Sequence, residues 1–449
     1  MTTDSARRGP VEHDAPVRYT VLSVKVIIAW AVLIVAVGGA VTAWLLMGHT
    51  DRDTEADRLK LDAIRTAGSI VVGTGGAAAL LLAARRQRST EIALRQKDRD
   101  QADTALAFAL RERVAADTRD DAAARRITDL YTKAVELLGS PHAPVRLGGL
   151  YALERLAQDN PGQRQTIVNV LCACLRMPCE LPDDTSDDLP VEQIEDTYRA
   201  TYRERLQERE VRLTAQRLIT AHLCPGEHTD GPLSTFWRDI DLDLTAATLV
   251  GFSLRRCAVR TAVFRSATFV GYADFASAAF SGDADFGATT FTGGANFGAT
   301  RFAADADFEW TTFTEYANFE AATFATADFE WSTFGDGADF ESAQFTHSAN
   351  FGSTTFTDGA DFERTHFHDG ANFGAAGFTG YADFRTTVFG GTTNFGAATF
   401  TANADFHGAE FCPIPAPRTD SPTDPQVDFH STTFERGIPP ELADYTDLD

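Results

Sequence analysis

Cysteines are the first residues in this sequence whose type and spacing could do chemistry. Cys172, Cys174 and Cys179 form a C-x-C-x4-C motif inside an apolar helical stretch, and clustered thiolates of this kind bind zinc in many small domains. The spacing matches no zinc ribbon, so we expect packed thiols rather than a metal site. Six cysteines in 449 residues suggest no disulfide framework and are compatible with a reducing compartment. The other three, expected to be unpaired, are Cys224, Cys257 and Cys412.

Histidine and aspartate offer little more for catalysis. His366 and His368 flank Phe367 with Asp369 beside them, a group that could ligate a metal but is more typical of solvated surface. The sequence contains no P-loop, dinucleotide fingerprint, nucleophile elbow or zinc-protease helix. We therefore predict a protein that is not an enzyme, with no catalytic residue, cofactor, metal site or small-molecule substrate.

Two tryptophans form the one candidate site for a partner. The segments Phe308-Glu-Trp310 and Phe329-Glu-Trp331 place Trp310 and Trp331 21 residues apart, about one turn of the repeat described below. The two rings should therefore stack on the outside, where exposed Trp next to Glu could bind a cationic or aromatic partner. The alternative is that they only pack a corner of the fold.

A short repeat must position these residues. From Leu244 an apolar residue recurs every five positions, and from Phe269 the steps alternate between five and six as far as Phe411. A small residue lies two positions before each Phe, and Asp or Asn often lies between them, which is the alternation of a short strand with one buried side. An eleven-residue helical repeat is excluded because Phe at these steps follows no single stripe. The sixth residue of the longer units favours turns, so we place it at a corner.

The repeated Phe residues are predicted to form the core. Each buried ring should contribute about 1.5 to 3 kcal/mol, with some further gain from offset stacking. We expect these rings to be structural rather than part of a binding site. The predicted core comprises Phe275, Phe286, Phe297, Phe308, Phe319, Phe340, Phe351, Phe362, Phe373, Phe384, Phe395 and Phe406.

This pattern closely resembles the pentapeptide-repeat family, whose unit is a small residue, Asp or Asn, Leu or Phe, and two variable residues. Ala273-Asp-Phe-Ala-Ser277 and Ala338-Asp-Phe-Glu-Ser342 match that unit directly. The resemblance covers residues 243–411 and implies a right-handed quadrilateral β-helix with Phe stacked inside. Seven coils with Phe and one earlier coil with Leu and Val are expected. The alternation of five and six residues departs from the family pattern and makes each coil about 22 residues long.

Two uncharged runs near the beginning predict a membrane anchor. Residues 26–47 and 66–84 contain no charged residue, and about 20 apolar residues suffice to cross a bilayer. Basic residues crowd the end of the second run, which favours cytoplasmic termini. We therefore predict a multi-pass protein of the cell membrane, with two spans and both termini in the cytoplasm.

These elements predict an N-terminal transmembrane helical hairpin and an α-helical module, followed by the right-handed quadrilateral β-helix. The apolar residues of the helical stalk keep no clean heptad, so the sequence only weakly indicates a homo-oligomer formed through the stalk. One helix of the module resembles a HEAT repeat unit. The predicted segments are a cytoplasmic polar tail (1–25), a transmembrane hairpin (26–84), a helical stalk (85–138), a small HEAT-like helical module (139–230), the pentapeptide-repeat β-helix (240–411), and a Pro-rich loop with a last repeat pair and C-terminal cap (412–449).

Charge narrows the function classes. The net charge of -24 argues against direct binding of nucleic acid, which requires clustered Lys and Arg. The leading hypothesis is a membrane-anchored, non-catalytic scaffold or protein-binding module that faces the cytoplasm and binds an unknown protein partner. The alternative is an acidic DNA mimic that acts on a topoisomerase or another DNA-binding protein, as the resemblance implies for some family members. Residues 262–411 carry 20 acidic and 4 basic residues, a net charge of -16.

Overall fold

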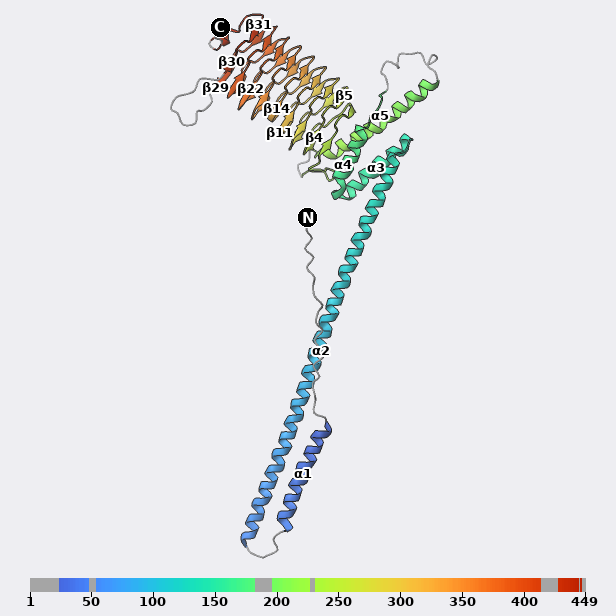
Figure 1. The fold of residues 1–449 in the computed structure, drawn as a ribbon, viewed down its shortest axis with the longest axis vertical. Coiled ribbons are helices and arrows are strands. Elements are labelled where there is room, and N and C mark those ends of the chain that lie inside the picture. Colours follow the sequence, from blue (N-terminus) through green and yellow to red (C-terminus); the bar gives the residue numbers. More distant parts are fainter. Residues whose placement is uncertain are drawn as a thin grey trace, which may run out of the picture. The chain divides into compact units, whose positions relative to one another are not determined.

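The structure is a computed structural model that describes residues 24–47, 54–181, 196–226, 231–412, 427–443 and 445. The chain divides into two compact units, residues 1–121 and 122–449. The first contains helix α1 (Val24–Met47) and most of helix α2 (Thr54–Leu138), which ends in the second unit (Figure 1). Most of the predicted polar tail, the Pro-rich loop at 413–426 and the last four residues lie outside the described residues.

The predicted membrane spans are wrong. Among the helices that the structure describes, none combines the length and the apolar character needed to cross a bilayer. The prediction of a multi-pass membrane protein with two spans and both termini in the cytoplasm is therefore wrong. It relied on two uncharged, apolar runs, but in the second, residues 66–84, Gly, Ala, Ser and Thr predominate and add little apolar surface. The second run lies inside α2, whose composition over 85 residues is largely polar.

In the second unit a small helical module covers the first coil of a β-solenoid. Leu153 and Leu171 of the helices share one continuous core with Leu244 and Leu249 of the first coil. Gln216 donates a side-chain hydrogen bond to the Val250 carbonyl (2.9 Å) and accepts one from the Val250 N–H (3.1 Å), so the helices cover the exposed edge of the sheet. The module consists of α3 (Ala143–Asp159), the 3₁₀ helix η1 (Pro161–Gln163), α4 (Arg164–Arg176) and α5 (Asp196–Leu223).

A disulfide corrects the expectation that all cysteines are unpaired. Cys224, just after α5, is bonded to Cys257 in the first coil, 33 residues along the chain. Sequence spacing alone could not reveal this pair, because only the packing of the helical module against the solenoid brings the two residues together. Cys172, Cys174, Cys179 and Cys412 are free.

Each coil of the solenoid presents four short strand positions, and every strand pair is parallel. We number the faces in the order in which the chain visits them (Figure 1). Face 1 contains β1 (Leu242–Asp243), β4 (Ala262–Val263), β8 (Ala284–Asp285), β18 (Ala349–Asn350), β22 (Gly370–Asn372), β26 (Thr392–Asn394) and β30 (Val427–Asp428). Face 2 contains β2 (Thr248–Val250), β5 (Thr268–Val270), β9 (Thr290–Phe291), β12 (Thr312–Phe313), β15 (Thr333–Phe334), β19 (Thr355–Phe356), β23 (Gly377–Phe378), β27 (Thr399–Phe400) and β31 (Thr433–Phe434).

The other two faces complete each coil, and two long strands cross a corner. Face 3 contains β6 (Ala273–Asp274), β10 (Ala295–Asn296), β13 (Ala317–Asn318), β16 (Ala338–Asp339), β20 (Ala360–Asp361), β24 (Ala382–Asp383) and β28 (Ala404–Asp405). Face 4 contains β3 (Ala258–Val259), β7 (Ala279–Phe280), β17 (Gln344–Phe345), β21 (His366–Phe367), β25 (Val388–Gly390) and β29 (Glu410–Cys412). Strands β11 (Arg301–Asp307) and β14 (Thr323–Asp328) run from face 4 into face 1, and η4 (Pro440–Leu442) follows the last coil.

Phe rings fill the interior in columns that run along the solenoid. All twelve Phe residues predicted as core are buried. Rings of successive coils stack nearly parallel, as in Phe308 and Phe329, whose centroids lie 4.7 Å apart. Most buried Thr hydroxyl groups donate to a backbone carbonyl, as Thr354 does to Phe329 at 2.7 Å, whereas the buried Thr393 hydroxyl has no partner among the described residues. The rings therefore stabilise the fold and are not available to a ligand.

A corner absorbs the one irregularity of the repeat. Phe324 and Phe329 are five residues apart where the pattern would give six. In the pairing of β11 with β14, Phe302 lies opposite Phe324, and the register then shifts by one residue so that Asp305 lies opposite Thr326. Ala306 and Ala327 are again in register beyond it. The missing residue is thus lost at the corner, as expected, and no later side chain changes sides.

The architecture is a C-terminal β-solenoid of about eight turns with an N-terminal helical module. Its Phe residues at regular five-residue spacing are consistent with a pentapeptide-repeat fold. The predicted transmembrane hairpin is wrong, and the bounds of the other five segments stay predictions.

Candidate partner-binding surface

Many aspartates of the solenoid have a structural role at its corners. On face 1 the Asp328 carboxylate accepts a hydrogen bond from the backbone N–H of Glu330 at 2.9 Å. On face 3 Asp361 accepts one from the Glu363 N–H at 2.8 Å. A side chain that bonds the backbone two residues on is the usual way in which Asp and Asn stabilise turns. These aspartates therefore give no evidence for catalysis.

The residue after each of these turns has a left-handed backbone, and at two coils it is Trp. Trp310 and Trp331 have φ values of 59° and 58°. A bulky residue is uncommon in this region because its Cβ crowds the backbone. The equivalent residue of the other coils on this corner is small: Ala246, Ser266, Ala288, Ser353, Ala375, Ala397 and Ser431. The fold therefore does not require Trp at either position.

The two indoles stack on the outside of the solenoid. Their ring centroids lie 5.2 Å apart and their planes differ by 6°, the arrangement that their spacing in the sequence predicts. Trp310 is 59% exposed and Trp331 is 50% exposed, so the pair leaves much of its apolar surface to solvent. The next coil has Ser353 in this column, and the stack therefore ends at Trp331. Whether the pair binds a partner stays a prediction.

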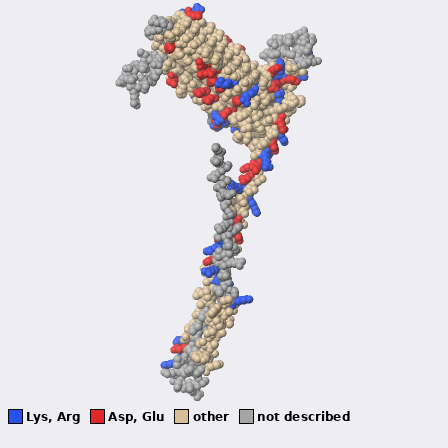
Figure 2. Space-filling view, viewed as in Figure 1, with Lys and Arg blue, Asp and Glu red and all other residues tan. Residues whose placement is uncertain are grey.

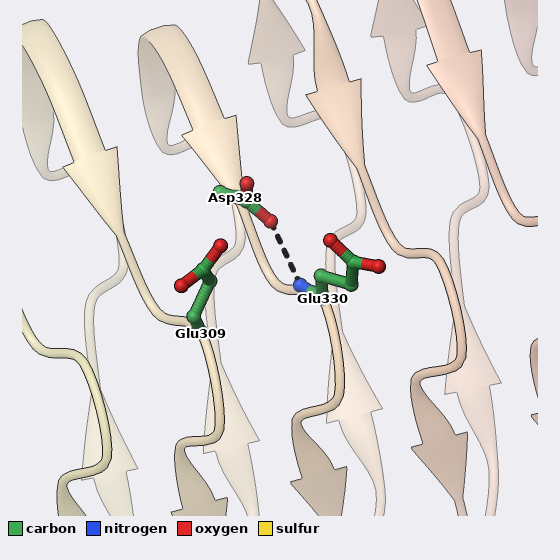
Figure 3. Close-up of side chains that lie close together, drawn as sticks. All are labelled: Glu309, Asp328 and Glu330. Carbon is green, nitrogen blue, oxygen red and sulfur yellow. Dashed lines mark hydrogen bonds between the residues drawn. The ribbon is translucent and has the colours of Figure 1, made fainter.

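Three carboxylates lie beside the Trp pair and form what we call the acidic cluster: Glu309, Asp328 and Glu330. One oxygen of each lies within 4.8 Å of the others (Figure 3). Burial raises the pKa of Glu309, and the neighbouring negative charges of Asp307, Asp328 and Glu330 raise it further. Like charges held at this distance repel each other unless a cation compensates them.

Neighbouring side chains compensate only the edges of the acidic cluster. Arg265 forms ion pairs with Asp285 (2.8 Å) and Asp307 (2.7 Å). Asn350 donates to Asp328 at 3.0 Å and to Glu330 at 3.3 Å. Within the described part of the chain, the Glu309 carboxylate forms no ion pair or side-chain hydrogen bond, and the charge of Arg265 offsets its neighbours only in part. In Figure 2 acidic side chains gather on one part of the visible solenoid face with some basic side chains next to them, and the rest of that face is largely uncharged.

The acidic cluster alone is a poor metal site. It offers three carboxylate oxygens, one from each residue, whereas Ca²⁺ takes six to eight oxygen ligands and Mg²⁺ needs octahedral geometry. A second group of the same size, Asp339, Glu341 and Asp361, lies on face 3. The stacked indoles next to the first group favour an organic cation, which can contact both ring and carboxylate.

The other residues considered from the sequence form no such surface. Burial raises the pKa of Cys172 to about 12, and burial also raises the pKa values of Cys174 and Cys179, so none of these thiols is an activated nucleophile. The rings of His366 and His368 stack with centroids 4.0 Å apart. Burial lowers the pKa of His366, and the proximity of His368 lowers it further.

Two features of this surface were missed in the sequence. One is the convergence of Asp328 from its strand with Glu309 and Glu330 from two successive corners. The other is the left-handed backbone of the Trp positions. The tandem Phe-Glu-Trp segments one coil apart were the only available signal.

Comparisons with known protein families, curated proteins and solved structures find no match. No activity or partner can therefore be transferred from a relative. The function has to be argued from the surface of this chain itself.

Proposed function

We propose that this chain is a non-catalytic β-solenoid scaffold of the pentapeptide-repeat family, and that its Trp310–Trp331 surface binds an Arg-rich segment of a partner protein. One observation carries the proposal: two stacked, exposed indoles share a corner with an acidic cluster that forms no ion pair of its own, and the fold requires neither the indoles nor the two glutamates. Solenoids commonly use such extended outer surfaces for protein binding.

The chemistry of the surface favours a cationic partner. An Arg guanidinium is planar and can continue the indole stack at Trp331, above the small Ser353, through cation–π and stacking contacts. From there it can also form charge-assisted hydrogen bonds with the carboxylates of the acidic cluster. Lys has no planar group to stack, so Arg fits this surface better.

The scaffold assignment agrees with the roles of the acidic residues. The carboxylates of Asp328 and Asp361 stabilise turns, and a repeat β-solenoid is typically non-enzymatic. The same turn role weakens the DNA-mimic hypothesis, because much of the acidity is part of the repeat. No contact among the described residues favours that hypothesis, and it remains an untested alternative.

A peptide titration tests the proposal. The full chain is titrated into a fluorescently labelled peptide with several Arg residues, and into matched peptides with Lys or with citrulline, which keeps the planar shape of Arg without its charge. Fluorescence anisotropy measures each Kd at low and physiological salt. We expect the order Arg, Lys, citrulline, with about tenfold or more between Arg and citrulline. Equal affinity for all three peptides would contradict the proposal.

Charge variants locate the site. Glu309→Gln/Glu330→Gln should weaken binding of the Arg peptide by about tenfold. Glu320→Gln, on face 3 and outside the acidic cluster, provides the control for net charge and should bind nearly as the wild type does. The control and the double variant could lose the same affinity for the Arg peptide per charge removed. The acidic solenoid would then attract the peptide as a whole, and this result would contradict a site at Trp310 and Trp331.

A further inference from the structure

Face 3 lies opposite face 1 and carries a separate groove. One corner column of this face holds Tyr or Gly in six successive coils and Asn in the last, and two of its glycines are in neighbouring coils. The rings reach forward along the axis: the Tyr316 hydroxyl donates to Asp339 of the next coil at 2.8 Å, and the Tyr381 hydroxyl to Asp405 at 3.2 Å. The column consists of Tyr272, Gly294, Tyr316, Gly337, Gly359, Tyr381 and Asn403.

Because a Tyr ring covers the glycine of the following coil, a glycine that does not follow a Tyr in the column stays uncovered. A Cβ added to Gly337 would lie 3.4 Å from the Tyr316 ring, and one added to Gly294 would lie 3.3 Å from the Tyr272 ring, so both glycines are covered. In the column, Gly359 comes after Gly337 rather than after a Tyr, so no ring covers it. A Cβ there would meet only the Tyr381 carbonyl oxygen, at 3.8 Å. The result is a groove of about 510 Å³ between Tyr316 and Tyr381, which we call the Tyr groove.

The Tyr groove is acidic throughout. No Lys or Arg lines it, and its five carboxylates come from three successive coils. Arg385 forms an ion pair with Asp383 at one end, and the other four have no basic partner among the described residues. Burial raises the pKa values of Asp339 and Asp361, and the hydrogen bonds from the Tyr316 hydroxyl and the Glu363 N–H offset this only in part. The five are Asp336, Asp339, Asp358, Asp361 and Asp383.

We infer that the Tyr groove binds a linear aliphatic polyamine along the axis of the solenoid. Successive coils repeat the carboxylates about 4.8 Å apart, so the groove matches several positive charges in a row better than one compact ion. Methylene segments can pack against the Tyr316 ring while ammonium groups donate to the carboxylates on both sides of Gly359. Gly359 supplies part of the space, because a large side chain there would extend into the groove. This inference does not depend on the partner proposed for face 1.

Calorimetric titration of the full chain with spermidine tests the inference, with putrescine and Ca²⁺ as comparison ligands. We expect one saturable spermidine site that binds putrescine more weakly and is not displaced by Ca²⁺. Absence of a saturable site overturns the inference. So does tighter binding of Ca²⁺ with displacement of spermidine, which would make the groove a metal site.

Two variants separate the groove from general acidity. Asp339→Asn/Asp361→Asn should weaken spermidine binding about tenfold or more. Asn is tolerated at this repeat position, because Asn318 accepts the Glu320 N–H at 2.7 Å in the same way. The control Asp428→Asn, on face 1, should change the affinity little. Equal losses per charge removed would show diffuse attraction and overturn the inference.

A steric variant changes the shape of the groove without altering any charge. Gly359→Leu should abolish the saturable site. Gly377→Leu is the matched control, because a Cβ at Gly377 on face 2 meets no atom within 4 Å; it should bind as the wild type does. Thermal unfolding confirms that both variants fold. Spermidine binding that survives Gly359→Leu in a folded protein would contradict the inference.

Discussion

Face 1 has two halves, which differ in the residue at the outward strand position. In the acidic half this residue is Asp285, Asp307 or Asp328, and in the Asn half it is Asn350, Asn372 or Asn394. Both halves enclose the same Phe-filled interior. In the acidic half, Asp328 accepts the Glu330 N–H at 2.9 Å; in the other half, Asn350 accepts the Gly352 N–H at 3.0 Å. The turns are therefore equivalent. The Asn half continues as a ladder in which Asn372 donates to Asn350 and Asn394 donates to Asn372, each at 2.8 Å. In the acidic half the ladder positions are carboxylates, which cannot donate to each other.

The difference between Asn and Asp at these positions shows which outward residues the fold needs. Asn satisfies the turn and also bonds its neighbours, so the Asn half is complete in itself. The acidic half concentrates like charge beside two exposed indoles, and each of these features costs stability or solubility. A cationic partner would compensate both, and this comparison is the main physical argument for a site in one half only.

The largest expected effect should be the same in both halves. Phe329→Ala and Phe351→Ala each remove a fully buried ring from the same stacked column, and each should lower the free energy of unfolding by about 3 to 5 kcal/mol. Denaturant unfolding followed by circular dichroism measures the loss. An unchanged midpoint for either variant would contradict the stacked core, and a large difference between them would contradict the common interior.

A smaller effect should appear at the boundary between the halves. Asn350→Asp replaces the donor that bonds Asp328 and Glu330 with a third carboxylate, and should cost about 1 to 2 kcal/mol. Asn372→Asp is the control, because its neighbours in the ladder are neutral Asn350 and Asn394. Thermal and denaturant unfolding compare the two. A control as destabilised as Asn350→Asp would show that the acidic half carries no uncompensated charge.

The smallest effect concerns Glu309 and depends on pH. Its raised pKa means that ionisation above the ordinary Glu value of 4.5 destabilises the folded state. Glu309→Gln should therefore raise the Tm slightly at pH 7, by the equivalent of about 0.5 kcal/mol or less. The difference from the wild type should vanish as the pH falls below 4.5, where both unfolded and folded Glu309 are protonated. A variant with a lower Tm than the wild type at pH 7 would indicate an undetected stabilising partner of Glu309.

The fold of the solenoid was predictable because its signal is local and repeated. Phe at steps of five and six indicates inward strands, and one coil of separation was enough to predict that Trp310 stacks on Trp331. The Cys224–Cys257 disulfide depends on how the helical module packs on the first coil, which no local pattern encodes. The spans predicted at 26–47 and 66–84 were wrong, and in the second the many Gly and Ala residues add little apolar surface.

The candidate surface was predictable only in part. The Phe-Glu-Trp segments identified the indoles and their adjacent glutamates. The third carboxylate, Asp328, belongs to a strand, and it joins the acidic cluster only because coils stack in register. The Tyr groove could not be seen at all, since it depends on the direction in which each ring leans over the next coil.

The most direct test of the central claim is the affinity of Trp310→Ser/Trp331→Ser for the Arg peptide. Ser occupies the same left-handed corner position at Ser266 and Ser353, so this variant gives the acidic half the corner that the other half already has. Tyr272→Ala, which removes another exposed aromatic side chain, is the control. The account predicts an unchanged unfolding midpoint and a Kd about tenfold or more weaker for the double variant alone. A folded double variant that binds the Arg peptide as tightly as the wild type does would contradict it.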